Sequence, residues 1–576
     1  MSSRIRTLLA ELKRRKVYRV AVVYVIVGFA VIEGGQLIFD ALEFPRIAWQ
    51  FVVVLTLLGF PIALVLAWAL ELTPEGIRVT PPPEPPEGAE AGDLEPTDAL
   101  ITEPREPAPP RGPTDDRPCV VVLPFANLSG DPENEFFSDG VTEDIMARLA
   151  GIRGLRVISR TTAMTYKGSQ RNLPQIAAEL GAQAVVEGTV RRSAERVRVT
   201  AQLIAADRDE HLWADTYDRV LEDVFAVQSD VAENIARALR AELTPGERER
   251  MHRRPTDSLD AYDLCLKGLR IGESGDPEAL REAERYFGGA IALDPDYARA
   301  YAALSTTLGF NGFLGNVDPA QLFPQMKAAA QEAIKLDPGL GDAHTALAAV
   351  AFWYEWDWAT VDRELEMALK LNPDDSYALG FRGWTFVLRE RFAEAETDLN
   401  EAVRLDPLSP LRRLWLAHLH TFAGTPEEGV SIMDRVLRSD PQVYIARYWR
   451  GLCHLYAGNL GAAASDLDEA ISMVGRLPVP VAVRGVVHAV SGETERARQI
   501  LEELRSRANE EYVDPYCLFT LCLAVDGFDA AFPYLEQMLD TRSVFVSYLR
   551  VIRRFRDLRS DPRFMSALRT IWPDDF

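Results

Sequence analysis

Residues 383–407, which read GWTFVLRERFAEAETDLNEAVRLDP, decide the fold, because their small residues recur along the chain with an offset of 34 residues. The recurring positions form two columns: Gly383, Ala417, Gly451 and Gly485, and then Ala395, Gly429, Ala463 and Ala497. Small residues at both positions let the two helices of one unit approach closely, while larger residues fill the space between units. We therefore predict a tandem array of about seven helix pairs over residues 258–540.

Each predicted unit tends to end in a short motif in which proline follows Asp or Asn. The motifs are Leu293-Asp294-Pro295, Leu336-Asp337-Pro338, Leu371-Asn372-Pro373, Leu405-Asp406-Pro407 and Ser439-Asp440-Pro441. Proline cannot continue a helix, so these motifs mark the turns between units. The pattern resembles the tetratricopeptide repeat, with small residues at its eighth, twentieth and twenty-seventh positions and proline at its thirty-second. The resemblance implies a superhelix whose concave face binds peptide segments or partner proteins.

The N-terminal region has the composition of a membrane anchor. Residues 1–19 are rich in Lys and Arg, and apolar runs follow at 20–39 and 48–70. Each run can cross about 30 Å of hydrocarbon as a helix, so we predict a two-span transmembrane helical hairpin over residues 20–72, in contact with the lipid bilayer through residues 20–70. The basic residues predict a cytoplasmic N-terminus at the bacterial inner membrane and cytoplasmic C-terminal domains. If only the second run spans, those domains are periplasmic instead.

Three further segments complete the predicted organisation. Residues 73–118 are rich in proline and acid and cannot bury a core, so they form an extended linker. Residues 119–245 read as a small α/β domain that opens with a buried strand at Cys119–Phe125. Its last element is a helix over residues 221–243, and residues 541–576 are expected to cap the array with further helices. The predicted fold class is thus multidomain, with a transmembrane hairpin, an α/β domain and an all-α superhelix.

The α/β domain contains several recognisable sequence motifs. The relevant stretches are VLPFANLSGD (122–131), FSDGVTE (137–143), EGTVR (187–191) and AQLI (201–204). They resemble the TolB-like domain that often precedes tetratricopeptide repeats in bacteria. In that family, the same combination of domains also follows class III adenylate cyclase domains and the winged-helix domains of transcription regulators. We expect neither of those effector domains here, because only 19 residues precede the predicted hairpin.

Composition and motifs exclude several classes of function. A net charge of -23 argues against nucleic-acid binding, which needs a basic surface, and five scattered cysteines give no disulfide framework. No phosphate-binding loop, metal-binding motif or hydrolase motif is present, so we predict a protein that is not an enzyme and has no cofactor or metal. His420, His454 and His488 follow the repeat as a ladder, and Glu33 falls in the first apolar run. The histidines either pack between helices in place of tyrosine or form a metal-binding or pH-sensing ladder. Glu33 is either a functional carboxyl at membrane depth or a residue that lies near the outer end of the span or hydrogen-bonds across the hairpin.

The predicted concave face supplies the candidate binding residues. They are Phe352, Trp353, Tyr377, Trp384, Leu414, His418, Phe422, Tyr448, Leu452 and Tyr456. Aromatic anchors in a groove are typical of peptide-binding surfaces. We therefore predict a membrane-anchored, non-enzymatic scaffold that binds protein or peptide partners, as a monomer or a homo-oligomer. The alternative is a sensory or regulatory subunit that acts on a separate cyclase or transcription regulator.

Overall fold

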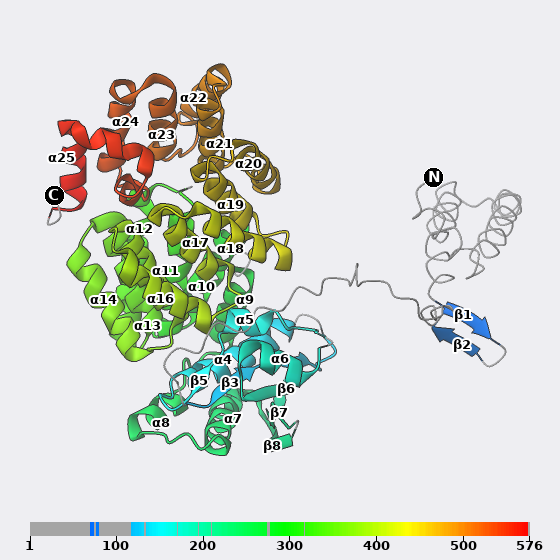
Figure 1. The fold of residues 1–576 in the computed structure, drawn as a ribbon. Coiled ribbons are helices and arrows are strands. Elements are labelled where there is room, and N and C mark those ends of the chain that lie inside the picture. Colours follow the sequence, from blue (N-terminus) through cyan, green and yellow to red (C-terminus); the bar gives the residue numbers. More distant parts are fainter. Residues whose placement is uncertain are drawn as a thin grey trace, which may run out of the picture. The chain divides into compact units, whose positions relative to one another are not determined.

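The computed structural model describes most of the chain after residue 116. The described residues are 70–73, 76–79, 117–131, 134–169, 171–193, 195–208, 210–272, 277–315 and 317–573. The chain divides into two units, Met1–Pro104 and Arg105–Phe576. In the first unit, strand β1 (Leu70–Thr73) pairs antiparallel with β2 (Gly76–Val79) (Figure 1).

The membrane part of the predicted fold class is wrong. Among the residues that the structure describes, no helix is both long enough and apolar enough to cross a bilayer. The predicted hairpin extended to residue 72, whereas its last residues belong to β1. Leu70-Glu71-Leu72-Thr73 alternates apolar and polar residues, which is the period of a strand and not of a helix. The rest of the two apolar runs, with Glu33, lies outside the described residues.

The second unit begins with the α/β domain, which in the structure comprises residues 117–252. Its sheet has six strands in the order β5-β3-β6-β7-β8, with β4 paired to β6. The strands are β3 (Cys119–Val122), β4 (Ala126–Asn127), β5 (Arg156–Val157), β6 (Ala184–Arg192), β7 (Arg196–Ala205) and β8 (Glu210–Val220). Strand β3 runs parallel to β5 and β6, whereas β6, β7 and β8 form an antiparallel meander.

The helices of this domain cover the sheet with their apolar faces. They are α4 (Glu135–Ala150), α5 (Arg160–Met164), α6 (Leu173–Leu180), α7 (Val224–Ala238) and α8 (Pro245–His252). Buried Val141, Ile145 and Leu149 of α4 recur at helical spacing and pack in one core with the valines of β3. The helix predicted over residues 221–243 is shorter, because α7 ends at Ala238 and Arg240 takes a left-handed conformation with φ of 58°.

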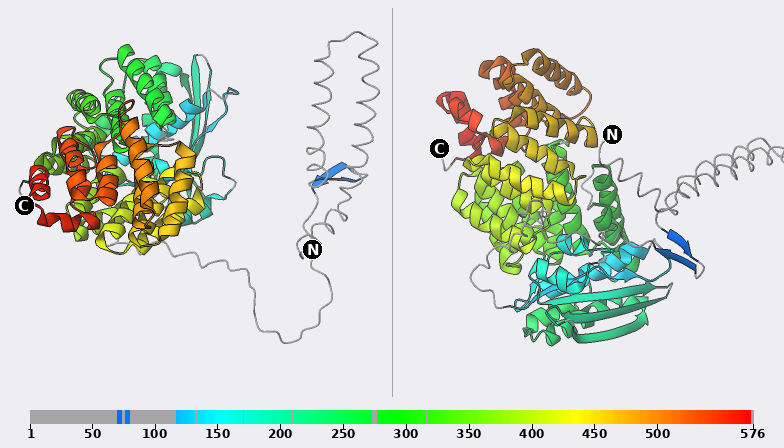
Figure 2. Two further views of the ribbon diagram at one scale, coloured as in Figure 1. Left: turned by 90° about the horizontal axis from the view of Figure 1, so that it is seen from above. Right: turned by 45° about the vertical axis from the view of Figure 1, so that its right-hand side comes forward.

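The rest of the unit is an array of helix pairs, as predicted, with eight pairs among the described residues where about seven were predicted. In chain order the pairs are α9 (Leu259–Gly272) with α10 (Pro277–Leu293), α11 (Ala298–Phe313) with α12 (Pro319–Leu336), α13 (Gly341–Val350) with α14 (Trp358–Leu371), α15 (Ser376–Leu388) with α16 (Phe392–Leu405), α17 (Pro410–Ala423) with α18 (Pro426–Ser439), α19 (Tyr444–Tyr456) with α20 (Leu460–Val474), α21 (Pro478–Val490) with α22 (Thr494–Arg507), and α23 (Pro515–Asp526) with α24 (Phe528–Asp540). The pairs stack in sequence order above the sheet of the α/β domain (Figures 1 and 2).

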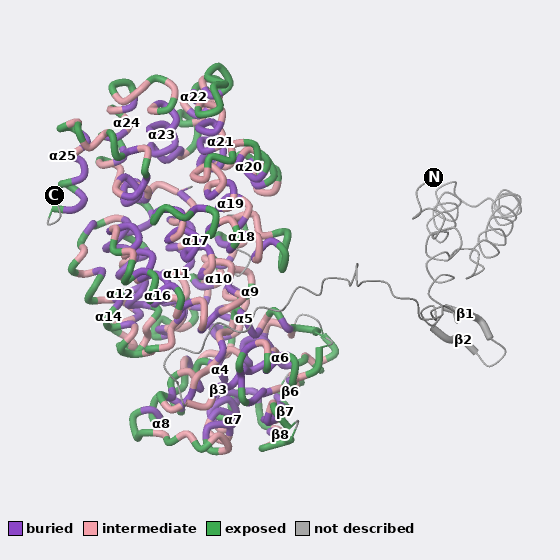
Figure 3. The backbone as a smooth tube through the Cα atoms, in the orientation of Figure 1, coloured by how far each residue is buried: buried purple, intermediate pink, exposed green. Residues whose placement is uncertain are grey.

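The small-residue columns have the predicted physical role. A Cβ atom added to Gly383 would lie 2.8 Å from Cγ of Leu399, and one added to Gly451 would lie 3.0 Å from Cγ of Leu467. In the units of Gly383 and Gly451, the first helix therefore approaches its partner more closely than alanine allows. Ala395, in the second column, is fully buried. Buried residues accordingly concentrate where neighbouring helices face each other, and exposed ones at the outer turns (Figure 3).

The chain ends in a segment that folds back onto the array. We call residues 543–573 the C-terminal strap; its helical elements are η4 (Val546–Leu549), η5 (Arg553–Ser560) and α25 (Pro562–Ile571). Trp572 stacks on Trp358, the first residue of α14, with ring centroids 5.8 Å apart, and the indole N–H of Trp358 donates to the carbonyl oxygen of Ile571 at 2.6 Å. The strap thus joins the end of the chain to its third helix pair.

Candidate functional site

The ten residues predicted for the binding groove lie together, in and against one core. Seven of them are buried: Phe352, Trp353, Trp384, Leu414, His418, Phe422 and Tyr448. The other three, Tyr377, Leu452 and Tyr456, are half-buried and pack against the same core. These side chains stabilise the contacts between neighbouring helix pairs, and their role as a partner-binding surface stays a prediction.

Several of these residues form an aromatic ladder through successive units. The ring of Phe352 lies 5.1 Å from that of Trp384, which stacks on Trp415 with centroids 6.3 Å apart. The indole N–H of Trp384 donates to Nδ1 of His418 at 2.9 Å. Burial lowers the pKa of His418 to about 3, so this imidazole is neutral and accepts that hydrogen bond.

The C-terminal strap covers this ladder. Tyr548 contacts Trp384 and Phe422 with ring centroids 6.1 and 6.0 Å away, and Phe545 stacks on Tyr516 of α23 at 4.9 Å. At Trp384 and Phe422, the predicted groove is therefore in contact with an aromatic residue of the strap. Sequence reasoning missed this contact because the strap lies far from the ladder along the chain and carries no repeat pattern.

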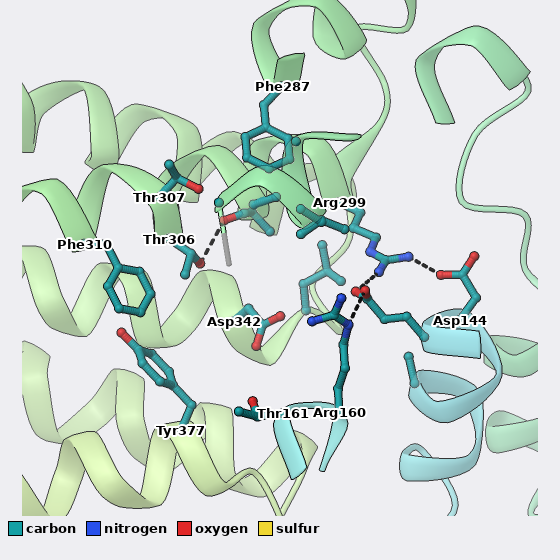
Figure 4. Close-up of a pocket in the computed structure, with 18 of the residues that line it drawn as sticks. Asp144, Arg160, Thr161, Phe287, Arg299, Thr306, Thr307, Phe310, Asp342 and Tyr377 are labelled. Atoms are coloured by element: carbon teal, nitrogen blue, oxygen red, sulfur yellow. Dashed lines mark hydrogen bonds and ion pairs between the residues drawn. The ribbon is translucent and has the colours of Figure 1, made fainter. Parts of the chain in front are cut away.

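A large cavity lies elsewhere, between the α/β domain and the array. Its volume is about 1550 Å³, and we call it the central cavity. Side chains from α4, α5, α11, α13, α15 and α17 line it, together with the segment after α8. Of the ten predicted groove residues, only Tyr377 is among the described residues that line it (Figure 4).

An ionic network spans the two sides of this cavity. Arg299 of α11 forms ion pairs with Glu143 and Asp144 of α4, and Arg160 bonds Glu143 at 2.7 Å. The phenol of Tyr262 donates to Asp144 at 2.5 Å. Burial pushes the pKa of Glu143 upward, but the charges of Arg160 and Arg299 hold it below the usual value. The network therefore ties α4 and α5 to the second helix pair by compensated charges.

Asp342, at the start of α13, differs from these acids. Its side chain is accessible from the cavity, and it forms no hydrogen bond or ion pair with any described residue. Burial and the neighbouring carboxylate of Asp375 raise the pKa of Asp342 to about 6. Asp375 itself caps α15 by accepting the backbone N–H groups of Tyr377 and Ala378 at 2.9 and 3.1 Å.

The turns that close the repeat units hold the α/β domain in place. Oδ1 of Asp406 accepts hydrogen bonds from the hydroxyls of Ser159 at 2.5 Å and Thr162 at 2.8 Å. Arg117 of the same domain bonds Asp374, which follows the Asn372-Pro373 motif, at 2.7 Å. Two further Asp-Pro carboxylates bind the segment after α8: Asp337 pairs with Arg253 at 3.0 Å, and Asp294 accepts a hydrogen bond from the hydroxyl of Thr256. The sequence predicts these motifs only as helix stops, whereas the carboxylates of three of them also bind other parts of the chain.

The histidine ladder has separate partners at each level. Nδ1 of His420 lies 3.1 Å from the Thr425 hydroxyl, and Nδ1 of His488 lies 2.6 Å from Glu493. His454 is 3.9 Å from Asp466. Within the described ranges, no group of three or more His, Cys, Asp or Glu side chains is arranged to hold a metal ion.

Comparison with known proteins agrees with the repeat architecture. The tetratricopeptide repeat family model matches residues 363–410 and 416–476, which confirms the predicted repeats in the middle of the array. The chain is also 40% identical over 247 residues to a protein named putative adenylate cyclase 3 from Rhizobium meliloti. The match covers 42% of this chain and 42% of that relative, so the chain spans less than half of the relative's length.

Solved structures of repeat proteins are similar at low identity. A tetratricopeptide repeat protein from Parabacteroides merdae is 17% identical, with a TM-score of 0.33, and covers 47% of this chain and 100% of its own. YrrB, described as a repeat protein with an unusual peptide-binding site, is 20% identical, with a TM-score of 0.23, over 34% of this chain and 97% of its own. Similarity at this level concerns the repeat fold alone.

Proposed function

We propose that this chain is a non-enzymatic scaffold that binds a protein partner by taking up an extended segment of it in the central cavity. Tetratricopeptide repeat proteins generally mediate protein–protein interactions, through the concave surfaces that stacked repeats create. Here Tyr548 of the strap contacts the predicted groove at Trp384 and Phe422. The observation that carries the proposal is the central cavity, a large accessible recess among the described residues.

The size and lining of the cavity favour a peptide over a small molecule. Small-molecule sites usually enclose about 300–1,000 Å³. At about 1550 Å³ the central cavity is larger, and it combines aromatic side chains such as Phe287, Phe310 and Phe313 with charged ones from the ionic network. Aromatic walls with a few convergent polar groups provide both the anchors and the orientation that peptide recognition needs.

A matched pair of substitutions tests this proposal. Thr306 of α11 lines the cavity, and its hydroxyl donates to the carbonyl oxygen of Ala302 at 3.1 Å. Thr397 of α16 makes the same bond with Ala393 at 3.2 Å but lies exposed outside the cavity. Thr306→Trp places an indole in the cavity, and Thr397→Trp places the same group in solvent.

The assay is binding of peptides selected from a phage-displayed random library by the full chain. We expect Thr306→Trp to weaken the selected peptides by about tenfold or more, and Thr397→Trp to leave their affinity unchanged. Circular dichroism of both variants controls for folding. Selected peptides that bind Thr306→Trp as tightly as the original chain would exclude the cavity as the binding site.

The relative from Rhizobium meliloti favours a second candidate function. Because the matched region belongs to a protein named as an adenylate cyclase, the same region here is a candidate regulatory subunit for a separate cyclase. The purified chain would then change the activity of a cyclase from its own organism in a saturable way. Cyclase activity that stays constant at every concentration of the chain would rule this candidate out.

Two sequence-based expectations stay predictions. The resemblance of the α/β domain to TolB-like domains rests on the four quoted stretches, and a partner search with residues 117–252 tests it. The predicted location at the inner membrane, with the C-terminal domains in the cytoplasm, concerns an N-terminal region that lies mostly outside the described residues. Protease digestion in spheroplasts compared with inverted vesicles distinguishes a cytoplasmic from a periplasmic location.

A further inference from the structure

Asp342 is a carboxylate without a counter-ion at the wall of the central cavity. The charged groups that act on it are Asp375, Glu143 and Arg299. Two of these are acids, and the third, Arg299, is already paired with Glu143 and Asp144. The charge of Arg299 is therefore already compensated by these two acids, whereas the Asp342 side chain is exposed to the cavity and its charge is available to a ligand.

The groups around Asp342 suit the side chain of a basic residue. Phe310 of α11 and Tyr377 of α15 line the cavity with Asp342, and Figure 4 shows Asp342 between Tyr377 and the ionic network. Burial raises the pKa of Tyr377 to about 12, and the charge of Asp342 contributes to the rise, so the phenol is neutral. Aromatic faces attract cations, and they also pack against the long alkyl stems of lysine and arginine.

We infer that Asp342 binds the side-chain cation of a lysine or arginine in the partner segment, an inference that rests on the proposed function of the cavity. The ammonium or guanidinium group forms an ion pair with the Asp342 carboxylate, while its stem lies against Phe310 and Tyr377. The net charge of -23 on the whole chain agrees with a basic partner, because it attracts positively charged segments over longer distances.

The test uses peptides selected by the full chain from the phage-displayed random library. We expect a lysine or arginine at one fixed position of the selected peptides. Two synthetic peptides then differ only there, one with lysine and one with norleucine, which keeps the stem and removes the charge. The original chain should prefer the lysine peptide by about tenfold or more, as expected for a hydrogen-bonded charge pair from which the bound peptide excludes water.

Two variants assign that preference to Asp342. Asp342→Asn removes the charge with little change in shape and should bind both peptides equally, with the affinity for the norleucine peptide unchanged. Asp540→Asn, at the exposed end of α24 and outside the cavity lining, makes the same change in net charge and should keep the lysine preference.

The outcomes separate this inference from the proposed function. A lysine preference that persists in Asp342→Asn overturns the inference, as do selected peptides that lack a basic residue but still lose affinity in Thr306→Trp. In both cases the cavity stays a peptide site. If no selected peptide is sensitive to Thr306→Trp, the proposed function fails and the inference fails with it.

Discussion

Gly383→Ala should destabilise the array, although alanine normally stabilises a helix. Ala is preferred over Gly in a helix interior by about 1 kcal/mol. At Gly383 the new methyl would lie 2.8 Å from Cγ of Leu399, a fully buried side chain, and 3.1 Å from Cβ of Asp398, which no side-chain rotation can move. Overpacking of this kind costs about 1–3 kcal/mol, so we expect a net loss of roughly 0–2 kcal/mol.

Gly288→Ala is the matched control for this prediction. Gly288 lies within α10, is exposed, and has no atom within 4 Å of an added Cβ. It should therefore show the helix preference alone and stabilise the chain by about 1 kcal/mol. The difference between the two variants, about 1–3 kcal/mol, isolates the cost of the close helix contact.

The assay is urea unfolding followed by far-ultraviolet circular dichroism, with midpoints compared because long repeat arrays need not unfold in one step. Hydrogen exchange in α15 and α16 reports the local effect of Gly383→Ala. If both alanine variants raise the midpoint equally, the small-residue column does not act through close helix packing, and the physical reason given for it is wrong.

Two further predictions concern the docking turns and Asp342. Asp406→Ala removes the acceptor of the Ser159 and Thr162 hydroxyls and should lower the free energy of unfolding by about 3 kcal/mol. Denaturation measures this loss, and hydrogen exchange in α5 should become faster. Asp406→Asn keeps an acceptor and should lower the free energy of unfolding by less. Equal losses in the two Asp406 variants would contradict this account. Asp342 has a folded pKa of about 6, raised above its unfolded value by burial and by Asp375, so the folded state loses stability as pH rises from about 4 to above 6. Asp342→Asn should therefore be more stable than the original chain at pH 7 and no more stable at about pH 4, measured as urea midpoints; a pH-independent difference would refute this.

The part of the fold that the sequence could predict is the part built from local periodicity. Gly383 and Ala395 recur with the repeat, and the packing of Leu399 against Gly383 follows from that recurrence. A tandem array needs only contacts between neighbouring units, so one stretch of 34 residues contains most of the residues whose contacts recur through the array. The predicted transmembrane hairpin is wrong, because that prediction gave length and hydropathy more weight than the alternation at Leu70–Thr73, which forms strand β1.

The candidate site depends on contacts that no periodicity predicts. Arg299 meets Asp144 across 155 positions of sequence, and Tyr548 meets Trp384 across more. The sequence gives no signal for Asp342, because its lack of a counter-ion appears only when α4, α11 and α13 are brought together. Tyr377 packs with the other predicted groove residues, and it also lines a cavity that the α/β domain completes.

The C-terminal strap has a consequence for how this array could change during evolution. Open repeat arrays gain and lose units by tandem duplication, since each unit contacts only its neighbours. Here Trp572 must reach Trp358, and Tyr548 must reach Trp384, from beyond the last helix pair. An extra unit between these points would move the strap away from Trp358 and Trp384 and expose the aromatic ladder. Natural relatives that keep both contacts should therefore have the same number of units between Trp358 and the strap, while insertions collect in the outer turns.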